Sequence, residues 1–250
     1  MATLKRRIVD AVADRLGLEV VRKGMAWELI ELEQLRRFFE SFRVDCVFDV
    51  GANAGQYAMR LREIGFSGRI ISFEPNPDLA TELRAAAQRD TSWVIKEIAL
   101  DSESRVVDFN IMKRSTFSSL LEPDHSQTAL FRDMNVIERQ IQIKTRTLAE
   151  LYSELQSEFA FKRPFLKMDT QGHDVAVIRG AGRLANSFVG LQSELGFTPL
   201  YKGAPMFYES LEYYKSLGFK LTALIPNNAG HFPDLNELDC IMYSSEFSEI

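Results

Sequence analysis

The chain has 250 residues, of which 46% are hydrophobic and 26% are charged, with 30 Lys and Arg against 35 Asp and Glu. This length and hydrophobic content indicate one large globular domain and exclude a chain that is disordered over most of its length. The net charge of −5 argues against a nucleic acid or an anionic membrane surface as the main partner.

The first 43 residues are predicted to be helical and to form an N-terminal extension, residues 1–43. Apolar residues recur at four-residue spacing from Leu4 to Leu16, and a second apolar stripe runs from Leu29 to Phe39. We expect these helices to pack on the main domain, and they are also the candidate contact for a homo-oligomer. Residues 44–250 are expected to form a single domain, because no repeat and no Pro/Gly-rich linker divides them.

From residue 46 onward, strand and helix patterns alternate. The predicted order is strand, helix, strand, helix, strand, over residues 46–50, 56–65, 69–75, 78–88 and 93–100. Such alternation is typical of parallel βαβ units in an open twisted sheet.

The second half of the chain continues this pattern after an irregular part. Residues 106–112 and 141–145 are interpreted as strand or sheet-edge segments, and the polar stretch 115–137 between them as a lid or substrate insertion. The remaining predicted strands and helices cover residues 164–169, 175–180, 187–195, 205–217, 219–225 and 239–243. Nothing in the sequence suggests a parallel crossover between the last two strands.

The most informative segment is V-F-D-V-G-A-N-A-G-Q-Y at residues 47–57. Gly51 and Gly55 bracket a tight turn into a helix, where the backbone can approach a ligand closely and the helix offers unpaired N–H groups. A dinucleotide site would show GxGxxG, but the middle position here is Asn53. Asp49 would repel a pyrophosphate at this turn and would suit the amino group of an amino-acid-like ligand.

Glu74 lies 19 residues after Gly55, at the end of the next predicted strand. A carboxylate at that position can accept hydrogen bonds from both hydroxyls of a ribose. Nicotinamide and S-adenosylmethionine sites share this feature, so Glu74 alone does not choose between them. Its combination with Asp49 and the G-A-N-A-G turn favours S-adenosylmethionine.

Nine short motifs then follow one another along residues 44–243. They are the 47–57 segment, F-E-P-N-P at 73–77, A-L-D at 99–101, S-S-L at 118–120, K-M-D-T-Q-G-H-D at 167–174, L-Q-S-E-L at 191–195, P-L-Y-K-G at 199–203, G-F at 218–219 and E-L-D-C-I at 237–241. In this order they resemble the FkbM family of class I S-adenosylmethionine-dependent methyltransferases. The resemblance implies a Rossmann-like α/β fold, with an open, twisted, mostly parallel seven-stranded sheet and helices on both faces.

The resemblance also assigns residues to the cofactor S-adenosylmethionine. It implies Asp49, Gly51, Asn53 and Gly55 for the methionine portion, Glu74 and Asn76 for the ribose, and Ala99 with Leu100 or Asp101 for the adenine. The family often has glutamate where this chain has Gln171, so the resemblance assigns no role to that side chain.

Methyl transfer to a hydroxyl needs a base, because an alcohol is a poor nucleophile until it loses its proton. In an open α/β sheet the site lies outside the carboxyl ends of the strands. The candidate catalytic residues at those ends are Asp169, His173 and Glu194, with His125 and His231 as further candidates in loops. Asp169 could instead cap the following helix, and His173 could simply be solvated.

No HxH, HExxH or EF-hand spacing occurs, and no metal site is predicted, although Asp169, Glu194 and Asp239 could together offer oxygen ligands to magnesium. The resemblance implies O-methylation of a hydroxyl on a small molecule or sugar. One alternative is a cofactor-binding protein without methyl transfer. A nicotinamide-dependent oxidoreductase is disfavoured by the absent central glycine and by the absence of any Tyr-x-x-x-Lys pair.

The sequence also gives expectations about binding partners and cellular location. Nucleic acid is not expected as a partner, because residues 169–172 read D-T-Q-G where base-modifying enzymes carry an Asn/Asp-Pro-Pro-aromatic motif. A membrane partner is not expected, because no apolar run approaches the roughly 18 residues that a spanning helix needs. Cys46 and Cys240 form no CxxC pair, which excludes zinc and disulfide scaffolds. We therefore expect a soluble, cytoplasmic enzyme.

Overall fold

The computed structural model describes residues 13, 15, 26–126, 131–226 and 233–247. The predicted apolar stripe from Leu4 to Leu16 falls almost entirely outside these residues. The candidate His231 also lies outside them. Within the described part of the chain, no helix combines the length and the apolar character needed to cross a membrane.

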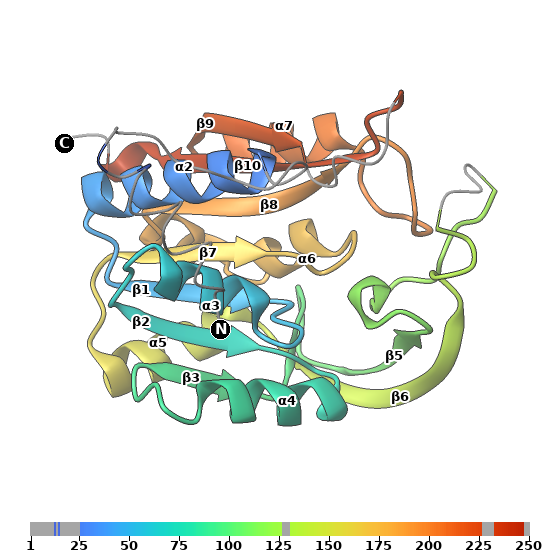
Figure 1. Cartoon of the computed structure of the whole chain (residues 1–250). Helices are drawn as coiled ribbons and strands as arrows, with labels where there is room; N and C mark the ends of the chain where they lie inside the picture. Colours follow the sequence, from blue (N-terminus) through green and yellow to red (C-terminus); the bar gives the residue numbers. More distant parts are fainter. Residues whose placement is uncertain (1–12, 14, 16–25, 127–130, 227–232, 248–250) are drawn as a thin grey trace.

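A seven-stranded sheet occupies the centre of the molecule, in the order β3-β2-β1-β7-β8-β10-β9 (Figure 1). Its strands are β1 Cys46–Val50, β2 Arg69–Phe73, β3 Trp93–Lys96, β7 Pro164–Met168, β8 Gly190–Gly196, β9 Phe219–Pro226 and β10 Glu237–Ser244. The pairs among β3, β2, β1, β7 and β8 are parallel, and β10 runs antiparallel to β8 and β9. The predicted open, mostly parallel Rossmann-like sheet is confirmed.

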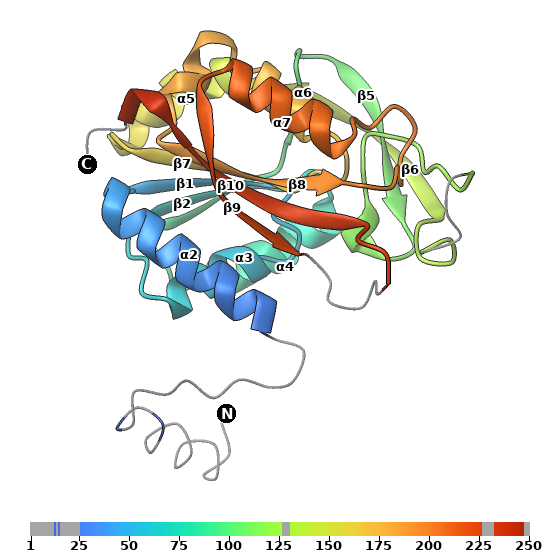
Figure 2. The ribbon, with the colours of Figure 1, turned by 90° about the horizontal axis from the view of Figure 1, so that it is seen from above.

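Helices cover both faces of this sheet, as predicted (Figure 2). One face carries α2 Ala26–Phe42, α3 Gln56–Glu63 and α4 Pro77–Ala87, and the other carries α5 Leu148–Phe159, α6 Asp174–Arg179 and α7 Phe207–Ser216. Every residue of β1 and of β7 is buried, because helices cover both faces of the sheet, and both strands are apolar except for Asp49 and Lys167. Two apolar clusters fill the two interfaces between sheet and helices.

The apolar face of helix α2 packs against the sheet of the same chain. Phe38 and Phe39 contact the ring of Phe165 on β7, with centroid distances of 5.2 Å and 5.1 Å. Gly190 at the start of β8 leaves room for this packing, because a Cβ there would lie 2.4 Å from Cζ of Phe38. The last turn of α2 is therefore anchored on the sheet, and its first turn lies toward the carboxyl ends of the strands.

Two sequence predictions need correction. The strand predicted over residues 93–100 is divided into β3 and a separate two-residue strand, β4 Ala99–Leu100. The N–H of Ile98 bonds the carbonyl of Lys96 at 3.0 Å, and this tight turn takes the chain out of the main sheet. Strand β4 instead joins a second sheet, of order β4-β6-β5, with β5 Val106–Met112 and β6 Ile137–Arg146.

Helix α5 was missed from the sequence. Thr147 and Glu150 form a capping box at its start, and its buried positions follow the spacing of one helical face. These buried residues are Leu148, Leu151, Tyr152 and Leu155. The helix carries the chain from β6 back to β7, so that β7 starts in line with β1.

Candidate functional site

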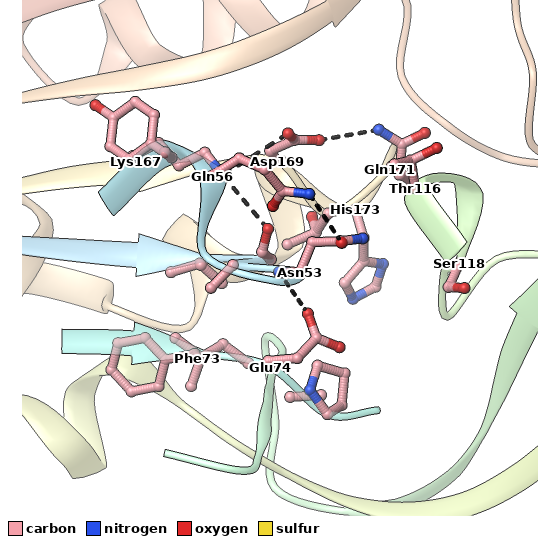
Figure 3. A pocket seen from close by; sticks show the side chains of 18 of the residues that line it. Asn53, Gln56, Phe73, Glu74, Thr116, Ser118, Lys167, Asp169, Gln171 and His173 are labelled. Carbon is pink, nitrogen blue, oxygen red and sulfur yellow. Dashed lines mark hydrogen bonds and ion pairs between the residues drawn. The ribbon is translucent and has the colours of Figure 1, made fainter. Parts of the chain in front are cut away.

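A cavity of about 330 Å³ lies at the carboxyl ends of the central strands (Figure 3). Its wall includes Gly51 after β1, Glu74 after β2 and Asp169 after β7. This volume falls at the lower end of the roughly 300–1,000 Å³ typical of small-molecule sites. The cavity therefore occupies the place where open α/β sheets bind their ligands.

The turn after β1 is shaped by its glycines. Gly51 has φ +77°, and a Cβ at this position would lie 2.0 Å from the carbonyl oxygen of Asp169. Gly55, at φ +91°, would bring a Cβ within 2.7 Å of the Trp93 ring, and it does not line the cavity. Asn53 lines the cavity in the left-handed region, at φ 51°. Only glycine allows the close approach of residue 51 to the carbonyl oxygen of Asp169, and this approach keeps the ends of β1 and β7 together.

Glu74 is held in place by the backbone of two loops. Its Oε2 accepts the N–H of Asn53 at 2.8 Å, and its Oε1 accepts the N–H of Asn76 at 2.9 Å. Burial raises the pKa of Glu74 to about 7 against the lowering effect of these two bonds. Asn76 itself caps α4 through a bond from the N–H of Asp78 at 3.1 Å, and it does not line the cavity.

The opposite side of Glu74 from the β1 turn is apolar. Ala99 and Leu100 of β4 and Phe109 of β5 line the cavity there. The second sheet, which the sequence did not predict, therefore supplies this wall. Among the residues predicted to flank an adenine, Ala99 and Leu100 face the cavity.

Asp49 does not line the cavity. It is fully buried, its Oδ2 accepts a hydrogen bond from Ser72 Oγ at 3.0 Å, and its Oδ1 lies 3.1 Å from Nζ of Lys167. Burial opposes the charge of Lys167, but the neighbouring Asp49 and Asp169 outweigh it and raise the pKa of the lysine. Sequence reasoning missed Lys167, and its signal was a lysine within the otherwise apolar strand P-F-L-K-M.

His173 and Asp101 form a pair at the cavity wall. Nε2 of His173 lies 2.9 Å from Oδ1 of Asp101, and the His173 ring lines the cavity. The Asp101 side chain is fully buried behind it and also contacts Arg105. Burial would raise the pKa of Asp101, but the bonds from His173, the Ser102 N–H and Arg105 outweigh it and hold the pKa below its usual value. Asp101, predicted to flank the adenine, thus lies behind the histidine.

Gln171 connects the other two predicted catalytic residues. Its Nε2 donates to Oδ1 of Asp169 at 2.9 Å and to Oε2 of Glu194 at 3.0 Å, and its Oε1 accepts the Tyr201 hydroxyl at 2.9 Å. Asp169 and Gln171 line the cavity, whereas Glu194 lies behind them. Burial, followed by the charges of Glu237 and Asp169, raises the pKa of Glu194 well above its usual value.

The insertion predicted as a lid borders the same cavity. Its residues Ser115, Thr116, Ser118 and Leu120 line the wall (Figure 3). His125 does not, and its Nε2 lies 2.8 Å from the carbonyl oxygen of Asn135. Over residues 26–126, 131–226 and 233–247, no group of three or more His, Cys, Asp or Glu is arranged to hold a metal ion.

One end of the cavity was not foreseen from the sequence. Glu31 of α2 and Gln192 of β8 line it, with Nε2 of Gln192 donating to Oε1 of Glu31 at 2.7 Å. Tyr57 donates its hydroxyl to Oε1 of Gln192 at 2.9 Å, and Arg60 and Asp239 complete this end. The signal for Glu31 was an acid inside the apolar stripe of Leu29 to Phe39.

A protein-family model matches most of the chain. The model described as "Methyltransferase FkbM domain" matches residues 49–221, which is more than half of the chain. No curated protein sequence matches the chain significantly.

Comparison with solved structures gives distant neighbours. Fibrillarin from Aeropyrum pernix, solved with bound S-adenosyl-L-methionine, has 12% identity and a TM-score of 0.44, and the match covers 79% of this chain and 66% of that one. This chain thus spans just under two thirds of that fibrillarin chain. A putative S-adenosylmethionine-dependent methyltransferase from Listeria monocytogenes has 9% identity and a TM-score of 0.47, with 88% and 97% covered. A TehB-like methyltransferase from Corynebacterium glutamicum has 12% identity and a TM-score of 0.41, with 96% and 95% covered.

Proposed function

The chain belongs to the FkbM family of methyltransferases, and from this premise we propose that it transfers the methyl group of S-adenosylmethionine to a hydroxyl oxygen of a small molecule or sugar. The observation that carries the proposal is the placement of Glu74 and His173 on the wall of one cavity. A buried carboxylate suited to a ribose thus faces the same space as a base suited to a hydroxyl group.

Three parts of the wall fit the cofactor. The two oxygens of Glu74 each accept one backbone N–H, and each keeps a further lone pair for a ribose hydroxyl. Ala99, Leu100 and Phe109 offer an apolar surface for an adenine. Gly51 and Asn53 bring the backbone close to the remaining portion of the cofactor. Hydrogen bonds to a charged acceptor such as Glu74 contribute about 1.5–3 kcal/mol each.

When bound, S-adenosylmethionine supplies an electrophilic methyl group on a positively charged sulfur. This chain's part is to orient the acceptor and to remove its proton. Asp101 is ionised and can only accept, so Nε2 of His173 must donate to it, which leaves Nδ1 as the basic nitrogen. Nδ1 would take the proton of the acceptor hydroxyl and so make its oxygen the nucleophile. The buried Asp101 then stabilises the charged imidazolium ring.

Asp169 has a different part in this proposal. Its carboxylate is 40% exposed toward the cavity, and Gln171 fixes one of its oxygens. We assign it to the orientation of the acceptor hydroxyl through a hydrogen bond. Positioning of this kind accounts for much of the acceleration of an in-line displacement.

The cofactor is tested first, by calorimetric titration of the protein with S-adenosylhomocysteine, with NAD as the parallel control. Binding of the first in the micromolar range without binding of NAD supports the proposal, whereas binding of NAD alone overturns it. The acceptor is tested next, with methyl-labelled S-adenosylmethionine and a panel of sugars and hydroxylated compounds. Label on a hydroxyl compound, and none on its deoxy analogue, supports O-methylation. Cofactor binding without label on any acceptor supports a cofactor-binding protein instead.

A further inference from the structure

We propose that helix α2, which precedes the residues matched by the family, binds the charged amino-acid end of the cofactor, with Glu31 accepting from its ammonium group and Arg60 donating to its carboxylate. This inference rests on the proposed cofactor, S-adenosylmethionine. It gives a binding role to a segment that the sequence suggested only as a packed helix or an oligomer contact.

The first argument is the position of Glu31. It lies near the start of α2, is only 9% exposed, and forms part of the cavity wall. Arg60 of α3 lies beside it, with Nη1 3.3 Å from Glu28 and 3.6 Å from Glu31. Nε of Arg60 is buried and finds no partner among the described residues. A carboxylate and a guanidinium therefore stand side by side at this end, which is the pairing that a zwitterionic amino acid requires.

The second argument is the direction in which the proposed cofactor lies in the cavity. Figure 3 shows Lys167 on one side of the cavity and Thr116 and Ser118 of the insertion on the other. The Lys167 side continues to Glu31, because Nζ of Lys167 lies 5.1 Å from the Tyr57 ring centroid and Tyr57 reaches Glu31 through Gln192.

The proposed function places the acceptor hydroxyl beside His173, in the cavity that Thr116 and Ser118 of the insertion also line. The reactive methyl must point toward that hydroxyl. The methyl and the amino-acid chain are separate substituents of the sulfonium, so the amino-acid chain is left to extend to the end where Glu31 lies.

The third argument is electrostatic. Asp49, which the sequence suggested for the amino group, has both oxygens engaged by Ser72 and Lys167 and does not line the cavity. Glu31 and Asp239 do line it. Burial, followed by the charges of Glu31 and Asp169, raises the pKa of Asp239 well above its usual value, and Lys167 only partly opposes this. An ammonium group between Glu31 and Asp239 would relieve this repulsion.

The test compares two ligands that differ in the amino-acid portion. S-adenosylhomocysteine carries it, and 5′-methylthioadenosine has the same adenosine and sulfur without it. Both are titrated calorimetrically into the full-length protein and into Glu31→Gln, which keeps the shape of the side chain and removes its charge. Glu40→Gln is the matched control, because Glu40 lies on the same helix with a side chain that is 66% exposed.

We expect Glu31→Gln to weaken the binding of S-adenosylhomocysteine by about tenfold or more and to leave that of 5′-methylthioadenosine within about twofold. Asp239→Asn is the second variant and should show the same selectivity, and Glu40→Gln should match the unmodified protein with both ligands. Equal weakening of the two ligands, or no effect on either, overturns the inference. If the unmodified protein binds neither ligand, the proposed cofactor itself is wrong, and the inference falls with it.

Discussion

Asp101 and His173 are 72 residues apart in the chain, yet Oδ1 of the carboxylate and Nε2 of the ring lie 2.9 Å apart. Two features of the fold bring them together. The chain leaves the main sheet after β3, and β4 in the second sheet ends immediately before Asp101. Helix α6 begins immediately after His173, beyond the end of β7. The carboxylate is buried, whereas the His173 ring lines the cavity, so the pair connects the cavity wall to a buried charge.

The first prediction concerns this pair. His173→Gln should lower kcat by about 10²–10³-fold, since general-base catalysis contributes about 10²–10⁴-fold. Asp101→Asn should lower kcat less, because Asp101 acts by holding the ring. The dissociation constant of S-adenosylhomocysteine should stay within about twofold in both variants. A kcat for His173→Gln within twofold of the unmodified enzyme would remove His173 from the mechanism.

The second prediction concerns the pH dependence of cofactor binding. Glu74 has its pKa raised to about 7, and it must be ionised to accept hydrogen bonds from both ribose hydroxyls. The ionised fraction of such a group falls about tenfold between pH 8 and pH 6. S-adenosylhomocysteine should therefore bind about tenfold more weakly at pH 6 than at pH 8, as measured by calorimetric titration.

A matched variant tests whether Glu74 is the group that causes this pH dependence. Glu74→Gln cannot ionise, so it should bind S-adenosylhomocysteine more weakly at pH 8 and lose the pH dependence between pH 6 and pH 8. His173→Gln should retain that dependence. If Glu74→Gln keeps the full tenfold change, another group is responsible and the ribose assignment of Glu74 is contradicted.

Much of the fold could be predicted from the sequence, because the buried parallel strands are mostly apolar. β1 and β7, each apolar except for one charged residue, were predicted with nearly correct bounds. The break between β3 and β4 could not be predicted, since W-V-I-K-E-I-A-L is one β-favouring run and only a backbone turn at Ile98 divides it. Helix α5 could have been found from its capping box at Thr147 and Glu150.

The site was predictable where local sequence fixes the position of a residue. Gly51 in the turn after β1, at φ +77°, and Glu74 directly after β2 belong to this class, and both line the cavity. Side-chain pairing could not be predicted, because it joins strands that are distant in sequence. Asp49 with Lys167 is the example: a carboxylate expected to face a ligand is neutralised by a lysine 118 positions later.

The third prediction concerns Gln171. Its amide joins Asp169 to Glu194, and burial, followed by the charges of the neighbouring carboxylates, already raises the pKa of Glu194. Gln171→Glu removes the two N–H bonds and adds a third acid, so the variant should be destabilised by about 1–3 kcal/mol at pH 8. The loss should shrink at pH 5, where protonation of one acid restores a donor. Urea unfolding at the two pH values measures both effects.

A neutral variant separates charge from bonding at the same position. Gln171→Leu also loses the two bonds, but it adds no charge. Its destabilisation should therefore differ little between pH 8 and pH 5. If Gln171→Glu behaves in the same way, the repulsion among the acids is too weak to matter, and the bridging role of Gln171 reduces to packing.

The fourth prediction concerns the turn after β1. Gly51 has φ +77° and would place a Cβ 2.0 Å from the carbonyl oxygen of Asp169, whereas Gly65 has φ +88° with nothing within 4 Å of a Cβ. Gly65→Ala should cost only the backbone strain, about 1–2 kcal/mol. Gly51→Ala carries the same strain and must also push β1 away from β7, so it should lose more stability in urea unfolding and weaken S-adenosylhomocysteine binding by about tenfold or more. Equal stability and equal binding in the two variants would mean that the close approach of Gly51 to Asp169 does not shape the cofactor site.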